Sequence, residues 1–148
     1  MTNKVNKKIE IRNSLIHAYG LFWRRDEINW NPGKGNANEF RLLGRDGSNA
    51  GTLRIIDARL QAGLYILYGN YGPYYVGKAQ SLGTRLKRHL SDEHSEKWDR
   101  FLWFGFNPVL VTRDNYGIKK LGKVAQSKHV TPQSIIEDVE ALLIVLWH

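Results

Sequence analysis

The chain has 148 residues and a formal net charge of +8, and 42% of its residues are hydrophobic. This length suits one domain, or one domain with a small appendage, and the apolar content excludes a globally disordered chain. There is no cysteine, which excludes disulfides and thiolate zinc sites. The positive charge favours a polyanionic partner, most simply nucleic acid, although a soluble protein can also be basic by chance.

We expect neither a secretion signal nor a membrane span in this chain. Its first residues lack the apolar run of a signal peptide. No apolar stretch approaches the roughly 20 residues that a membrane span needs. We therefore expect a cytoplasmic protein with no membrane partner.

The N-terminal part shows only weak signals. Residues 4–19 have rough helical spacing, residues 21–23 are typical of a strand, and residues 29–38 are typical of a loop. We assign residues 1–60 to a β-rich N-terminal extension of mixed helix and strands.

The second half of this extension contains a hairpin candidate. Residues 40–43 and 52–56 are strand-like, and the Asp46-Gly47 step lies between them. We find no chemical motif here, and we expect Trp23 and Trp30 to be packing residues, with stacking on nucleic-acid bases as the alternative role.

A second hairpin is predicted more clearly. Residues 64–68 and 74–76 are rich in β-formers, and glycine, asparagine and proline separate them. Side chains alternate along a strand, so if Leu67 lies opposite Tyr75, then Tyr65 lies opposite Gly77. The glycine leaves space beside the phenol. Such aromatic pairs can be reactive groups or ordinary cross-strand packing, and both interpretations stay open.

A basic helix is predicted directly after this hairpin, over residues 82–90. Leucines at 82, 86 and 90 form its apolar stripe. Arg85 and His89 lie one turn apart at the margin of that stripe. An arginine there needs an anion or a carboxylate for its donors, so a phosphate site and a salt bridge are both open.

The last third of the chain ends in a predicted helix. Residues 103–111 are strand-like with a break at Asn107-Pro108, and residues 114–128 are expected to be loop with some helix. Thr131-Pro132 then opens a helix. Glu140 falls within the apolar arc of that helix, where a carboxylate needs a cation. An arginine, a lysine or Mg²⁺ would serve.

Five features in register resemble the GIY-YIG nuclease family, namely Gly63-Leu64-Tyr65, Tyr75-Val76-Gly77, Arg85, His89 and the run Glu140-Ala141-Leu142-Leu143-Ile144. The likeness runs from about Gly63 to the C-terminus, so we assign residues 61–148 to a nuclease-like domain. It implies an α/β (α+β) fold in which a small three-stranded antiparallel sheet is flanked by helices. It also implies divalent-metal-dependent hydrolysis of DNA phosphodiester bonds.

The resemblance implies roles for individual residues. Tyr65 would take a proton from the attacking water, provided that Lys78 and the metal lower its pKa. Glu140 would hold Mg²⁺ or Mn²⁺. The implied catalytic residues are Tyr65, Tyr75, Arg85, His89 and Glu140, and the supporting residues are Gly63, Gly77 and Lys78.

The expected partner is DNA, in the first place duplex DNA. Its phosphates would contact a set of basic residues, namely Lys87, Arg88, Lys119, Lys120, Lys123 and Lys128. Many members of the family carry an asparagine shortly after the glutamate helix, and this sequence ends at His148 before such a position. The alternative function is a nucleic-acid-binding module with weak or no turnover, and a third is a structural protein with an incidental basic face. Monomer and dimer remain open.

Overall fold

The protein is described here from a computed structural model, over residues 16–32, 40–44, 47–48 and 55–124. These residues are mostly strands, and α2 (Leu82–Arg88) is the α-helix among them. A short 3-10 helix, η1, covers Arg25–Glu27. The strands are β1 (Ala18–Arg24), β2 (Leu43–Gly44), β3 (Gly47–Ser48), β4 (Ile56–Asp57), β5 (Gly63–Gly69), β6 (Gly72–Ala79), β7 (Arg100–Gly105), β8 (Val109–Arg113) and β9 (Lys119–Leu121).

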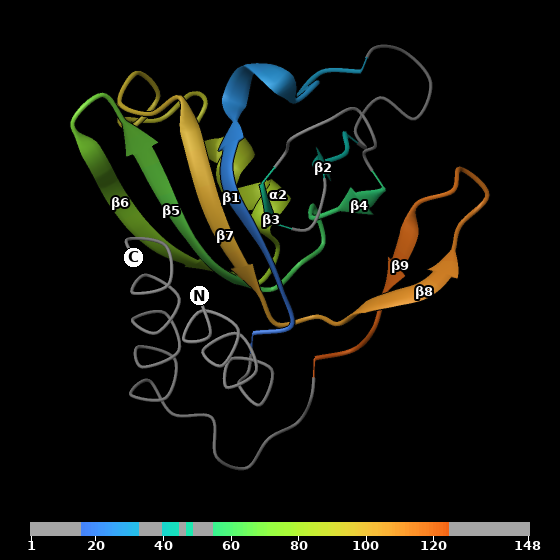
Figure 1. The fold of residues 1–148 in the computed structure, drawn as a ribbon. Helices are drawn as coiled ribbons and strands as arrows, with labels where there is room; N and C mark the ends of the chain where they lie inside the picture. The colour runs from blue at the N-terminus through green and yellow to red at the C-terminus, as the bar shows by residue number, and fades with distance from the viewer. Residues whose placement is uncertain (1–15, 33–39, 45–46, 49–54, 125–148) are drawn as a thin grey trace.

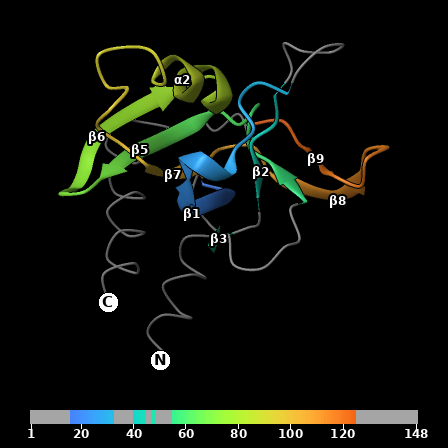
Figure 2. The same ribbon diagram turned by 90° about the horizontal axis from the view of Figure 1, so that it is seen from above.

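The strands form two sheets (Figure 1). The larger sheet has five strands in the order β3-β1-β7-β5-β6, and the smaller has four in the order β2-β4-β9-β8. Pairing is antiparallel except between β1 and β3 and between β4 and β9. Seen from above, α2 lies by β5 and β6, and the β8–β9 hairpin lies on the side away from β6 (Figure 2).

The expected fold class is therefore wrong. A three-stranded sheet flanked by helices was expected, and the described residues form a β-rich structure with two sheets. The main reason is β1, which pairs along β7 and adds a strand where a three-stranded sheet would have had an edge. An edge strand carries unpaired backbone groups, and hydrogen bonding to another strand satisfies them.

Several local predictions can be compared with the structure. The strand at residues 21–23 is confirmed within β1, but residues 18–19, expected to end a helix, are also strand. The break at Asn107-Pro108 separates β7 from β8 as predicted. The helix predicted from Thr131 lies outside the described residues, as does most of the helix predicted over residues 4–19.

The hairpin predicted around Asp46-Gly47 is only partly found. Its outer strands, β2 and β4, do pair with each other in antiparallel fashion. Gly47 and Ser48, however, form β3 and pair with β1 in parallel. The predicted division at residue 60 stays a prediction, although β1 shares a sheet with β5, β6 and β7.

The expectation of loop and helix after residue 114 is wrong for residues 119–121, which form β9. The Asp114 carboxylate accepts hydrogen bonds from the backbone N–H groups of Tyr116 (2.8 Å) and Ile118 (3.0 Å). Gly117 adopts a positive φ of 80°. This tight turn returns the chain alongside β8.

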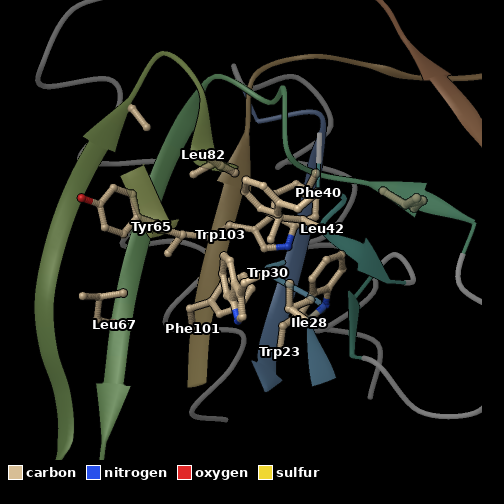
Figure 3. Packing of buried hydrophobic residues seen from close by; sticks show 14 of the residues in the cluster. Trp23, Ile28, Trp30, Phe40, Leu42, Tyr65, Leu67, Leu82, Phe101 and Trp103 are labelled. Atoms are coloured by element: carbon tan, nitrogen blue, oxygen red, sulfur yellow. The ribbon is translucent and has the colours of Figure 1, made fainter. Parts of the chain in front are cut away.

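Two apolar clusters hold the larger sheet. One contains Trp23, Tyr65, Leu67, Phe101 and Trp103, with Leu82 and Leu86 of α2 packed against them (Figure 3). The other contains Ile16, Ile66, Leu102, Phe104 and Phe106. Because successive side chains alternate, β5 and β7 contribute to both clusters, one from each face. The expected packing role of Trp23 and Trp30 is confirmed, since both are buried in the first cluster.

No helix in the part of the chain that the structure describes has the length and apolarity to cross a bilayer.

Candidate active site

The site begins at the β5–β6 hairpin, whose predicted register is confirmed. Tyr65 pairs with Gly77, and Leu67 pairs with Tyr75. A Cβ atom on Gly77 would lie only 2.3 Å from Cζ and from the hydroxyl oxygen of Tyr65. The phenol therefore lies directly across the glycine, with its hydroxyl directed toward β6 and away from the tryptophans (Figure 3). Tyr65 is only 1% exposed.

Gly63, the glycine of the first motif, allows close packing between β5 and β7. A Cβ at this position would lie 2.0 Å from the carbonyl oxygen of Phe104. Any side chain there would push β5 away from β7. Gly63 thus supports the site through the position of β5.

His89 joins the site from the end of α2. It is 4% exposed, and its Nε2 lies 2.7 Å from the Tyr65 hydroxyl. Its Nδ1 lies 2.7 Å from Oδ2 of Asp92. The second carboxylate oxygen of Asp92 accepts the backbone N–H of His94 at 2.9 Å. Hydrogen bonds at both ring nitrogens therefore fix the orientation of the His89 ring.

The Asp92 carboxylate determines where the ring proton of His89 lies. Burial acts to raise the pKa of Asp92, but hydrogen bonds from the His94 backbone and from His89 lower it overall. An ionised carboxylate only accepts hydrogen bonds, so Nδ1 of His89 must carry the proton. In the neutral ring, Nε2 then accepts the hydroxyl proton of Tyr65.

A group of aromatic rings surrounds this pair. The half-buried Tyr75 ring lies 6.1 Å from Tyr65, 5.3 Å from His89 and 4.6 Å from His94, between ring centroids. The Tyr74 hydroxyl lies 2.8 Å from Nδ1 of His94. The two predicted tyrosines and the predicted histidine therefore meet in one place.

The pKa of Tyr65 is shifted in the direction opposite to the one that the sequence-based mechanism requires. Burial, and to a smaller extent Tyr75, raise it to about 12, although the charge of Arg85 acts to lower it. Lys78 pairs with Leu64 in the register, so its side chain leaves the sheet on the face opposite to Tyr65. Tyr65 is a neutral phenol at physiological pH.

Arg85 is exposed on α2, and its charge acts on Tyr65. Within the described ranges no salt bridge involves Arg85, so its guanidinium faces no carboxylate there. Glu140, the predicted metal ligand, lies outside the described residues. The groups described around Tyr65 include phenols, imidazoles, a guanidinium and the Asp92 carboxylate, which already contacts His89, whereas Mg²⁺ prefers a set of oxygen ligands.

Basic residues gather at a hollow beside α2. This hollow has a volume of about 420 Å³ and is lined by Phe40, Arg59, Leu60, Ser81, Thr84, Lys87, Arg88 and Ser91. The Lys87 ammonium also lies 4.9 Å from the centre of the Phe40 ring. The buried Nε of Arg59 has no hydrogen-bond partner among the residues placed by the structure. Cations and hydroxyls in one hollow suit a phosphate group.

The other predicted basic residues lie elsewhere. Lys119 and Lys120 belong to β9, and Lys123 follows it. Lys119 and Lys120 are therefore on the β8–β9 hairpin, which lies apart from α2 (Figure 2). Lys128 lies outside the described residues.

Sequence reasoning missed Asp92 and His94. Their spacing from His89, His-x-x-Asp-x-His beginning at the end of a predicted helix, was the available signal. The hydrogen bond from the backbone N–H of His94 to Asp92 is an Asx-type turn, which brings the three side chains together.

Comparison of the chain with known protein families, with curated proteins and with solved structures finds no match. The resemblance to GIY-YIG nucleases therefore rests on the motif residues alone.

Proposed function

We propose that the protein hydrolyses phosphodiester bonds in DNA and requires a divalent metal ion, Mg²⁺ or Mn²⁺. The observation that carries this proposal is the hydrogen-bonded series Tyr65–His89–Asp92, with 2.7 Å at each link. It runs from a phenol through an imidazole to a carboxylate. The motif resemblance and the excess of positive charge support it.

The series offers a route for the proton of an attacking water. The water proton would pass to the hydroxyl oxygen of Tyr65 while the Tyr65 proton moves to Nε2 of His89. Tyr65 stays neutral in this route, as its raised pKa requires. The Asp92 carboxylate would stabilise the imidazolium that forms, as the aspartate does in a Ser-His-Asp triad.

Two further groups complete the proposed mechanism. Arg85 would neutralise the charge that develops on the phosphoryl oxygens. Glu140 would hold the metal, whose chemical contribution is Lewis-acid stabilisation of the leaving oxygen. The hollow beside α2 would bind a backbone phosphate of the same DNA strand or of its complement.

The first test is cleavage of supercoiled plasmid DNA by the full chain with Mg²⁺ or with EDTA. We expect EDTA and Glu140→Gln to abolish cleavage. Tyr65→Phe should lower the rate by about 100-fold or more, because the proton route is lost. Tyr71→Phe is the matched control, since Tyr71 is a fully exposed phenol on the same hairpin. It should cleave within about twofold of the wild type.

A second candidate is a binding module with the same site but without turnover. The near-complete burial of Tyr65 favours it, because a phenol that is 1% exposed meets little water. Salt-dependent binding of DNA by the wild type without Mg²⁺-dependent cleavage would support this candidate and contradict the nuclease.

A further inference from the structure

We propose that His89, Asp92 and His94 form a binding site for a transition-metal dication of the Zn²⁺ type. One ligand atom from each residue lies within 4.8 Å of the other two. Tetrahedral zinc ligands lie about 2.1 Å from the metal, and hence roughly 3.4 Å apart. Small side-chain rotations would bring the three atoms to that spacing.

The local fold already fixes this arrangement. The Asp92 carboxylate is held by the His94 backbone N–H and by the His89 ring. The two imidazole rings are 5.2 Å apart at an angle of 71°. A site whose ligands are held near their bound positions loses little conformational entropy when the metal binds.

The ligand set indicates the class of metal. Two imidazoles and one carboxylate suit Zn²⁺ and its first-row neighbours, whereas Mg²⁺ prefers oxygen ligands. The site is also open enough for an ion to enter, because the Asp92 and His94 side chains are 27% and 16% exposed. Glu93, whose carboxylate lies 3.5 Å from Nε2 of His94, or a water could supply a fourth ligand.

Zn²⁺ bound at this site would block the proton route through His89. This second half of the inference rests on the proposed nuclease function. Nε2 of His89 faces the buried Tyr65, so the metal would take Nδ1, which now contacts Asp92. The remaining ring proton would then lie on Nε2 and donate to Tyr65. His89 could no longer accept a proton from Tyr65, and Zn²⁺ would inhibit cleavage that Mg²⁺ supports.

The binding half is tested by calorimetric titration of the chelator-treated full chain with ZnCl₂. We expect His94→Ala and Asp92→Asn each to weaken binding by about tenfold or more, because the first removes a ligand nitrogen and the second replaces an anionic ligand with a neutral amide. Asp92→Asn preserves the side-chain shape and guards against a folding defect. His17→Ala is the matched control, since His17 is an exposed histidine outside the site, and it should bind as the wild type does. Unchanged binding by both site variants would overturn the proposal.

The inhibition half is tested in the plasmid assay as the ratio of rates with and without Zn²⁺ at constant Mg²⁺, within each variant. Zn²⁺ should lower the wild-type rate by about tenfold or more, and the His94→Ala rate much less. Zinc binding at the site without any Mg²⁺-dependent cleavage would refute the nuclease and leave the metal site standing. If the wild type cleaves DNA with Mg²⁺ but both site variants bind zinc as tightly as the wild type, the metal site is refuted and the proposed nuclease function is retained.

Discussion

Position 77 has room only for the hydrogen atom of glycine. A methyl group there would lie 2.3 Å from two atoms of the Tyr65 ring system, and the ring is enclosed by the main apolar cluster. We predict that Gly77→Ala lowers the free energy of unfolding by about 1–3 kcal/mol, the usual cost of overpacking. It should also displace the hydroxyl from His89 and lower cleavage. Urea unfolding and the plasmid assay measure the two effects.

The neighbouring residue provides the comparison for Gly77. Val76 is exposed on the opposite face of β6. Val76→Ala should change the free energy of unfolding by less than about 0.5 kcal/mol. If Gly77→Ala is equally harmless, then the Tyr65 ring does not lie across the strand as described.

Burial of Tyr65 also predicts a dependence of stability on alkaline pH. Its pKa is raised from 10.0 to about 12, so between these values the folded state binds a proton that the unfolded state has lost. This contribution to stability is complete below about pH 10 and is lost as the pH rises through about 12. Over that range the wild type should lose up to roughly 3 kcal/mol that Tyr65→Phe does not lose.

Urea unfolding at about pH 8 and pH 11 measures this difference. Tyr71→Phe removes an exposed phenol instead, and its stability should follow the wild type at both pH values. A Tyr65→Phe protein whose loss between the two pH values equals that of the wild type would contradict the raised pKa.

The residues of the site were predictable in unequal measure. The pairing of Tyr65 with Gly77 followed from side-chain alternation once the turn was placed. The raised pKa of Tyr65 could not be predicted, because it arises from burial by residues distant in the sequence. Asp92 lies beyond the predicted helix, and the resemblance to nucleases includes no residue between His89 and Glu140.

At the scale of elements, the buried side-chain amide of Gln61, just before β5, forms two hydrogen bonds with the backbone of Asn107, just after β7. Nε2 of Gln61 donates to the Asn107 carbonyl at 2.8 Å, and the Asn107 N–H donates to Oε1 of Gln61 at 2.9 Å. The Asn107 side chain in turn accepts the N–H of Ala62 and donates to the carbonyl of Gly122. This network connects the strand that carries Tyr65 to the β8–β9 hairpin.

We predict that Gln61→Leu lowers the free energy of unfolding by about 2–4 kcal/mol. The leucine has a similar volume but leaves two part-buried backbone groups of Asn107 without their partner, at up to about 1–3 kcal/mol each. Leu60→Ala, at the exposed neighbouring position, serves as the control and should change little. Urea unfolding distinguishes the two, and equal small losses would show that water replaces the amide.

Elements with local causes were predicted well, and those with distant partners were not. The β5–β6 hairpin has its turn and its alternation within one short segment. β1 was recognised as a strand, but its pairing with β7 joins residues from opposite parts of the chain, such as Tyr19 and Phe104. β9 was missed because Lys119-Lys120 lacks the apolar alternation that marks a strand.

At the scale of the whole molecule, basic residues that the structure describes lie on distinct surfaces. Lys87 and Arg88 line the hollow beside α2, together with Arg59 and three hydroxyl side chains. Lys119 and Lys120 are adjacent residues of β9, so their side chains leave the strand on opposite faces. A DNA backbone could contact the first pair together, but only one member of the second pair.

We therefore predict different salt dependence for two variants of equal charge. Replacing Lys87 and Arg88 by glutamine should reduce the slope of log K against log salt concentration by about two for duplex DNA, because each phosphate contact contributes about 0.9. The same replacement of Lys119 and Lys120 should reduce it by about one or less. Fluorescence anisotropy of a labelled duplex over a range of NaCl concentrations measures both slopes. Equal reductions would mean that DNA responds to the net charge alone, and the hollow beside α2 would then have no special part in binding.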